Sequence, residues 1–224
     1  MTRTPLCERK LPDYTRGEDM ANMVTHIIGG GVGIVVLVWA VLLSALQKNI
    51  WGVVAGSIYG FSMIALYSVS SVYHGLRPGM GKRVMQVIDH CMIYFLIAGT
   101  YTPILLCAIR PRYPVLSWVV FGVEWALVAF AVTFTAIDTA KYSKLSMICY
   151  IGMGWLIILV LRPTLETMGR EGFMWLLMGG VSYTVGAVLY GIGKKKHHVF
   201  HTVFHVFVDA GSILQAVCIL NYVL

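Results

Sequence analysis

Three histidines, a serine and an aspartate interrupt a chain that is otherwise apolar, and their spacing suits a metal site. His201 and His205 in "HTVFH" are four residues apart, as are Ser70 and His74 in "SSVYH", so each pair points from one face of a helix. Three neutral imidazoles with a water or a carboxylate make a tetrahedral zinc site with an open fourth position, as in catalytic zinc sites. Asp89 or Ser70 could orient or deprotonate such a water, so both are candidate catalytic residues.

The rest of the chain predicts a bundle of membrane-spanning helices. Of its 224 residues, 58% are hydrophobic and 12% are charged, and the apolar residues form long runs. A hydrocarbon core about 30 Å thick needs roughly 20 apolar residues of helix. Seven such stretches are expected, at 21–47, 49–76, 84–109, 113–137, 145–161, 172–193 and 199–224. We therefore predict an all-α membrane protein with seven transmembrane helices, preceded by a tail of residues 1–20.

The positions of the cations predict how the bundle is oriented. Twelve of the 17 lysines and arginines lie in the tail or in the loops after the second, fourth and sixth stretches, and five lie in the other loops. Because cytoplasmic loops carry the excess of lysine and arginine, we expect the N-terminus in the cytoplasm and the C-terminus outside. The net charge of +7 then fits a basic face opposite anionic lipid, and no nucleic-acid partner is expected.

This topology brings the five polar residues to a similar depth. Counted from the nearest loop cation at 1.5 Å per residue, His74 lies about 5 Å, Ser70 about 10 Å and Asp89 about 9 Å below the cytoplasmic boundary. His201 and His205 lie about 8 and 13 Å below it. Ionisable groups at such depths are costly unless they are paired or bound to metal, so function is the first hypothesis.

Of three alternatives to a zinc site, two remain open and one is excluded. A single membrane histidine commonly forms an interhelical hydrogen bond, and two histidines on separate helices could ligate haem iron. A retinal pigment needs a buried lysine, whereas all eight lysines lie in the tail or loops, so that class is excluded. His197 and His198 are assigned to the loop with the neighbouring lysines.

Five further polar residues have no settled role. Glu18, Asn22 and His26 begin the first stretch on the side of the predicted zinc site, where they could contact the ligands or simply anchor the helix end. Asp209 lies one turn beyond His205 on the same face and could hydrogen-bond to another helix. Glu124 lies in the middle of the fourth stretch, where a carboxylate must be protonated or paired.

Four motifs carry a family resemblance over essentially the full length. They are "GEDMANMVTH" at 17–26, "SSVYH" at 70–74, "DH" at 89–90 and "HTVFH" at 201–205. With them the chain resembles the haemolysin III family, the bacterial branch of the progestin and adiponectin receptor group. The resemblance implies a multi-pass protein of the bacterial inner (plasma) membrane, with a zinc site near the cytoplasmic side formed by the matching Ser70, His74, Asp89, His201 and His205.

Three classes of function remain. The first is a zinc-dependent hydrolase of lipid amides, acting in membrane lipid homeostasis on a lipid-amide or fatty-acid ligand. The second is a receptor-like sensor of membrane state that uses zinc structurally. The third, a cytolytic pore-former, has the least support, because long apolar helices predict a resident membrane bundle. The sequence does not indicate whether the protein is an enzyme, nor its oligomeric state.

Overall fold

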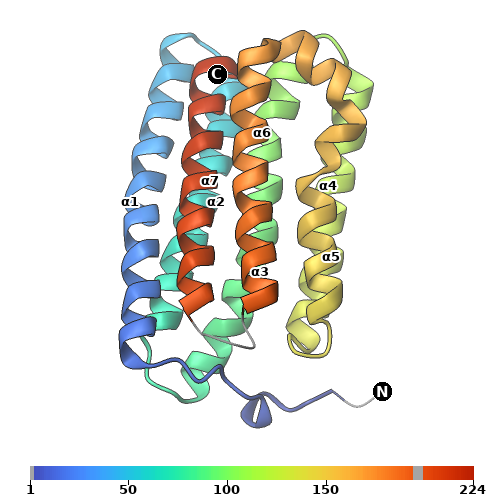
Figure 1. Cartoon of the computed structure of the whole chain (residues 1–224). Coiled ribbons are helices and arrows are strands. Elements are labelled where there is room, and N and C mark those ends of the chain that lie inside the picture. The colour runs from blue at the N-terminus through green and yellow to red at the C-terminus, as the bar shows by residue number, and fades with distance from the viewer. Residues whose placement is uncertain (1–2, 194–198) are drawn as a thin grey trace.

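The computed structural model describes residues 3–193 and 199–224, and this part of the chain is helical throughout, without strands (Figure 1). The loop at 194–198, with its lysines, His197 and His198, lies outside the described residues. After a short 3-10 turn, η1 (Leu6–Glu8), the elements are α1 (Arg16–Leu46), α2 (Ile50–Gly75), α3 (Met80–Pro103), the π-helical η2 (Ile104–Ile109), α4 (Pro114–Ile137), α5 (Ser143–Gly154), the 3-10 turn η3 (Leu156–Val160), α6 (Leu161–Gly193) and α7 (Val199–Tyr222).

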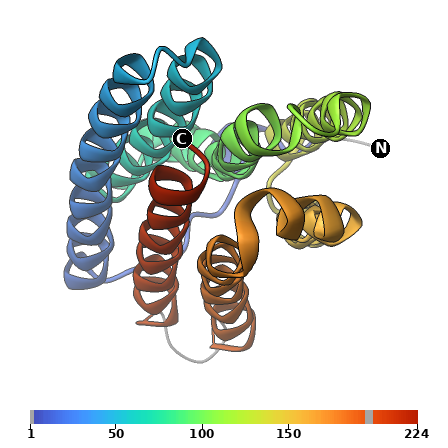
Figure 2. The same ribbon diagram turned by 90° about the horizontal axis from the view of Figure 1, so that it is seen from above.

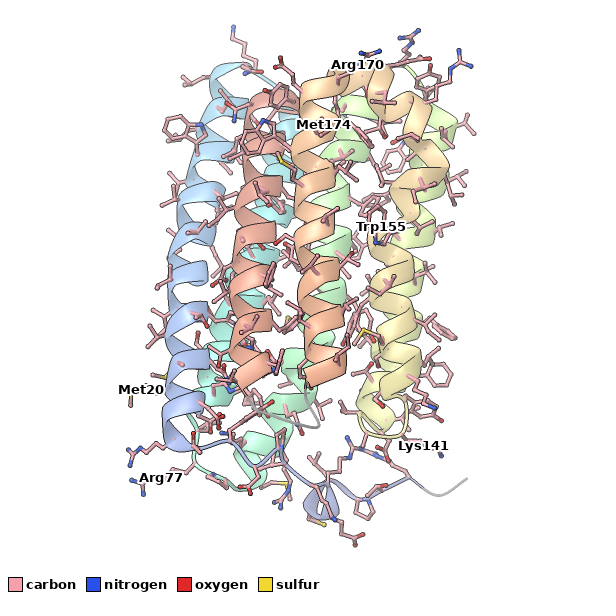
Figure 3. All side chains as sticks on the ribbon, viewed as in Figure 1. Met20, Arg77, Lys141, Trp155, Arg170 and Met174 are labelled. Carbon is pink, nitrogen blue, oxygen red and sulfur yellow. The ribbon has the colours of Figure 1, made fainter. Side chains whose placement is uncertain are left out.

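Six described helical segments are long and apolar enough to cross a membrane, not the seven that the sequence led us to expect. The difference lies in Ser143–Gly193, which is a single helical run of 51 residues. As one straight helix it would be about 76 Å long, more than twice the thickness of a hydrocarbon core. Instead the backbone breaks at Gly169, where φ is 70° and ψ is 177°. Lys141 and Arg170 therefore lie at opposite ends of the bundle, with Trp155 between them (Figure 3).

The exterior of the bundle is apolar, as expected for a surface that faces lipid. Val35, Phe61 and Leu159 are 64%, 67% and 75% exposed, whereas Tyr59 and Tyr67 are fully buried. A soluble protein rarely exposes so many large apolar side chains together. The distribution agrees with the multi-pass membrane protein that the composition predicts.

Helix α1 packs along α2 and α7 (Figure 2). This packing places the first turns of α1 beside His205. The contact with α2 is close because small residues line it: a Cβ atom added at Gly60 would lie 2.6 Å from Leu37 Cα. The beginning of α1, the end of α2 and the beginning of α7 therefore lie at the same end of the bundle, and Figure 1 shows this arrangement.

Helix α1 begins at Arg16, five residues before the first stretch expected from the sequence. A capping box explains the early start: Thr15 Oγ1 accepts a hydrogen bond from the Glu18 amide, and the Glu18 carboxylate accepts one from the Thr15 amide. The expected tail of residues 1–20 is therefore shorter, and Asp19 belongs to the first turn of a helix.

The shorter tail is held across the end of the bundle. The Thr4 amide donates to Asp138 Oδ2 over 3.3 Å, and the Arg9 guanidinium donates to the carbonyl oxygen of Ile137. Arg83 Nε on α3 in turn donates to the Arg9 carbonyl oxygen over 2.9 Å. These contacts direct the chain from α4 past α3 toward the beginning of α1.

Candidate metal centre

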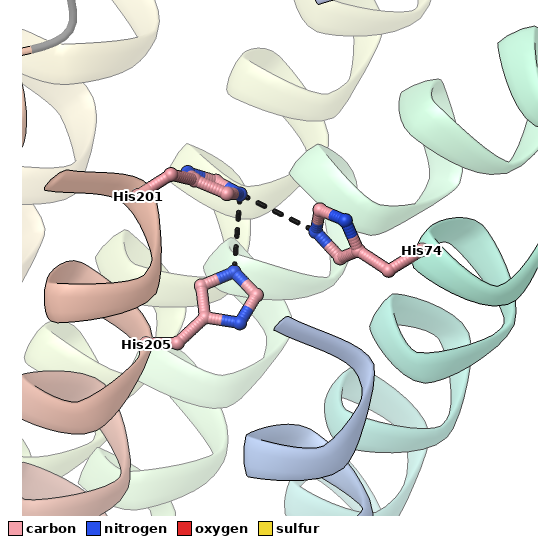
Figure 4. A group of neighbouring side chains, drawn as sticks. All are labelled: His74, His201 and His205. Atoms are coloured by element: carbon pink, nitrogen blue, oxygen red, sulfur yellow. Dashed lines mark hydrogen bonds between the residues drawn. The ribbon is translucent and has the colours of Figure 1, made fainter. Parts of the chain in front are cut away.

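The structure brings three of the predicted ligands together. His74 from the end of α2 and His201 and His205 from the first turns of α7 point at one another (Figure 4). His201 Nε2 lies 3.3 Å from His74 Nε2 and 3.1 Å from His205 Nε2, and the three possible ligand atoms lie within 4.8 Å of one another. The side chains of His74 and His205 are buried. The histidines that were predicted from spacing and depth thus form one group.

The hydrogen bonds on the far side of two rings fix which nitrogen faces this group. His74 Nδ1 lies 2.9 Å from Asp19 Oδ1, and His205 Nδ1 lies 3.3 Å from the Asn22 carbonyl oxygen. Both partners only accept hydrogen bonds, so each Nδ1 carries the proton and each Nε2 presents a lone pair.

Hydrogen bonds alone cannot explain the close approach of the three Nε2 atoms. His201 Nε2 can donate at most one proton, to one of the two lone pairs that face it. A cation between the rings would accept the Nε2 lone pairs of all three histidines at once. Zinc–nitrogen bonds of about 2.0–2.1 Å at a tetrahedral angle hold two nitrogens about 3.3 Å apart. The distances from His201 Nε2 to His74 Nε2 and to His205 Nε2 are close to this value. The residues present therefore fit a metal ion.

Ser70 and Asp89, the two predicted catalytic residues, line a cavity beside the histidines. Asp89 is buried on α3, and its Oδ2 lies 3.7 Å from His90 Nδ1. Ser70 Oγ is also buried, next to the Asp89 carboxylate. The structure thus places both groups beside the metal centre, and their chemical roles stay predictions.

The cavity has a volume of about 350 Å³ and is lined mostly by apolar side chains from α2, α3, α5, α6 and α7. Its polar end contains Ser70, Asp89, His90, His201 and His205. Along α7 the lining continues from His201 to Gln215, and along α3 and into η2 from Asp89 to Ile104. These intervals of 14 and 15 residues correspond to about 21 Å of helix, so the cavity is long and narrow.

The end of the tail covers the histidines. The Tyr14 ring stacks on His201 with centroids 5.1 Å apart and an interplanar angle of 16°. Tyr14 also lies 5.8 Å from the His74 ring, centroid to centroid. Burial raises the pKa of the Tyr14 phenol above its usual range, so the hydroxyl keeps its proton at neutral pH. The segment expected to be a tail therefore forms one wall of the site.

Of the other polar residues noted in the sequence, some contact the three histidines and others do not. His26 stacks on the metal-centre residue His205, with centroids 3.7 Å apart and planes at 6°. Asn22 contributes its carbonyl oxygen, as described above, whereas Glu18 serves the capping box. Asp209 Oδ1 and both Glu124 oxygens are buried without a hydrogen-bond partner among the described residues, and Glu124 is not part of the cavity wall.

Sequence reasoning missed Asp19 and Lys82. Asp19 accepts from His74 Nδ1, and the ammonium group of Lys82, at the beginning of α3, donates to its other carboxylate oxygen. The available signal was the motif "GEDMANMVTH" itself, in which Asp19 directly follows Glu18. Because the first stretch was expected to begin at residue 21, Asp19 was assigned to the tail and Lys82 to a loop.

Comparisons with known proteins agree over most of the chain. The sequence model of a family described as "Haemolysin-III related" matches residues 14–216. "Hemolysin-3" of Bacillus cereus is 36% identical over 207 residues, covering 92% of each chain. "Hemolysin-3 homolog" of Bacillus subtilis (strain 168) is 34% identical over 209 residues, covering 93% of this chain and 96% of that one. The human "Monocyte to macrophage differentiation factor" is 26% identical over 216 residues, covering 92% and 84%.

Proposed function

The chain belongs to the haemolysin III-related family, and from this membership and its three-histidine centre we propose a zinc-dependent hydrolase of lipid amides in the bacterial plasma membrane. One observation carries the proposal: a group of three imidazoles stands at the polar end of a long apolar cavity inside a membrane protein. The partners of such a protein are membrane lipids, and its role is in lipid homeostasis.

Zinc is the metal that this ligand set suits. Three neutral imidazoles leave a fourth tetrahedral position open, which is typical of catalytic zinc, and oxygen-seeking ions such as magnesium prefer carboxylates and waters. Zinc in this position supplies a Lewis acid that polarises a carbonyl group and makes water more acidic.

The protein's own residues would divide the rest of the work. Asp89 would act as the general base, because its buried carboxylate lies at the polar end of the cavity. The Ser70 hydroxyl, which is buried beside Asp89 at the polar end of the cavity, would donate to the carbonyl oxygen of the substrate as negative charge develops there. Both assignments place the scissile group at the polar end of the cavity.

The shape of the cavity supports a substrate with one long acyl chain. Its length of about 21 Å along α7 exceeds the roughly 15 Å that the acyl chains of one leaflet span in a hydrocarbon core about 30 Å thick. A chain lying there would place its head group against Ser70, Asp89 and the histidines. That the head group is an amide is the part of the proposal that the hydrolysis assay tests.

We further propose that the chain crosses the membrane seven times, with the N-terminus in the cytoplasm. Ser143–Gly193 folds back at Gly169 and so accounts for two crossings. The tail and Leu224 lie at opposite ends of the bundle (Figure 1), which an odd number of crossings requires. Arg77 and Lys141 lie at the end with the tail (Figure 3), in keeping with the excess of cations on the cytoplasmic side.

The test is a hydrolysis assay on purified protein in detergent or vesicles. Ceramides and simpler acyl amides serve as substrates, and released fatty acid is measured by mass spectrometry. We expect release by the zinc-loaded protein and none above background from a His205→Ala variant. If the zinc-loaded protein releases no fatty acid from any amide, the hydrolase proposal fails and a sensor with structural zinc becomes the better explanation.

A further inference from the structure

We propose that Asp19 and Lys82 are positioning residues of the metal centre: Lys82 holds Asp19, and Asp19 holds His74 in the orientation and tautomer that metal binding needs. This inference rests on the metal site of the proposed function, but not on the hydrolysis of any substrate. It assigns a role to the first turn of α1 and to the beginning of α3, neither of which provides a ligand.

The geometry at Asp19 is that of a carboxylate that orients a metal ligand. Its Oδ1 accepts from His74 Nδ1 over 2.9 Å, on the opposite side of the ring from the nitrogen that faces His201. A histidine whose Nδ1–H is held by a carboxylate keeps Nε2 as the ligand atom, and the anion makes that nitrogen more basic. Because the His74 side chain is buried, no water can easily replace the carboxylate.

Lys82 is the reason to regard Asp19 as more than a helix-capping residue. Lys82 is only 3% exposed, its ammonium group donates to Asp19 Oδ2, and it lies 5.4 Å from the centre of the Tyr73 ring. Burying an ammonium group is costly unless it is paired, and a buried ion pair by itself contributes little to stability. Both Asp19 oxygens are thus occupied, one by the cation and one by the ligand.

The arrangement connects three helices to one ligand. Asp19 stands in the first turn of α1, His74 in the last turn of α2, and Lys82 in the first turn of α3. If the only purpose were to join helix ends, any well-packed side chains would serve. A role through His74 makes a distinct demand, because zinc binding itself must change when the charge on Asp19 or Lys82 is removed.

The experiment measures zinc affinity by competition with a chelator on the purified full-length protein. The variants are Asp19→Ala, Asp19→Asn and Lys82→Met, with Glu166→Gln as the matched control. Glu166 also pairs with cations, Arg112 and Arg162, but it lies in the part of α6 that precedes the Gly169 break, away from the histidines. The same samples are melted with and without zinc.

We expect Asp19→Ala to weaken zinc binding by about 10- to 100-fold, the usual effect of losing such a partner. Asp19→Asn keeps an acceptor but loses the charge and should weaken binding less, and Glu166→Gln should bind like the wild type. Because Lys82 acts through Asp19, Lys82→Met alone should weaken zinc binding. Added to Asp19→Asn as a double variant, it should weaken zinc binding no further.

Three outcomes overturn the inference. Unchanged zinc affinity in Asp19→Ala and Lys82→Met would show that the ion pair only joins helices, and then the thermal stability should fall equally with and without zinc. An equal effect of Lys82→Met in both backgrounds would remove the link through Asp19. A wild-type protein that holds no zinc would overturn the metal site and this inference together. If Asp19→Ala fails to fold, the zinc affinities of Asp19→Asn and Lys82→Met still test the inference.

Discussion

Single residues at the candidate metal centre divide into those that could hold an ion and those that would act on a substrate. His74, His201 and His205 present three nitrogens to one point, and the hydrogen-bond donors at His74 and His205 Nδ1 leave lone pairs there. Asp89 and Ser70 are not needed to complete three imidazole ligands, yet both line the adjacent cavity. Substitutions of these two residues therefore separate catalysis from metal binding.

The prediction at this scale concerns Asp89. Asp89→Asn keeps the size of the side chain but removes the base, which typically contributes ~10²- to 10⁴-fold in rate. We expect acyl-amide hydrolysis to fall by that factor at unchanged zinc content, measured as fatty acid released per bound zinc. Asp13→Asn, in an exposed part of the tail, is the matched control and should behave like the wild type. Turnover that survives in Asp89→Asn would remove this residue from the chemistry.

Helices α3, α6 and α7 line much of the cavity. Gly180 of α6 lines it, and a Cβ atom added there would meet no other heavy atom within 4 Å. A larger side chain at this position therefore occupies the space proposed for the acyl chain, without a clash in the protein. The effect of such a substitution should depend on the length of the substrate.

We predict that Gly180→Leu lowers the turnover of long-chain acyl amides by 10-fold or more and affects short-chain amides much less, because a buried leucine fills the volume of several methylene groups. Gly122→Leu is the control: Gly122 is also free of neighbours within 4 Å but lies exposed on α4, outside the cavity. Fatty-acid release is measured for both chain lengths. Equal losses for short and long chains would place the acyl chain elsewhere.

The elements also explain which parts of the site the sequence could predict. The three histidines could be predicted because both their spacing along a helix and their depth below the membrane boundary can be counted directly along the sequence. Asp19 was not, because its role depends on a capping box that begins α1 early and on how α1 packs against α2. The cavity was also hidden, since it results from five helices that pack together and no local pattern in the chain encodes it.

The described part of the molecule has an apolar exterior and a buried polar centre near one end, and the tail and the C-terminus lie at opposite ends of the bundle. The sequence predicted the helical membrane bundle correctly, while its division of Ser143–Gly193 into two spans stays a proposal that depends on the break at Gly169. A chain that folds back in this way should carry its N-terminus and its C-terminus on different sides of the membrane.

Reporter fusions test that arrangement. We expect a reporter fused after Leu224 to be active only if it functions outside the cytoplasm, and one fused before Met1 only if it functions inside, because the tail and the loops expected on its side of the membrane carry twelve of the 17 lysines and arginines. A fusion in the loop between α4 and α5 should behave like the N-terminal one. Both termini on the same side would contradict seven crossings and would move the metal centre relative to the cytoplasm.

The most direct measurement is the zinc content of the purified protein, prepared without chelators and determined by elemental analysis. Three converging imidazoles predict about one zinc per chain, and His74→Ala, His201→Ala or His205→Ala should each lower it strongly, because each removes one of the three protein ligands. A wild-type protein that carries no transition metal would contradict the metal centre. Bound iron with the absorption spectrum of haem would show that these histidines hold a haem group in place of zinc.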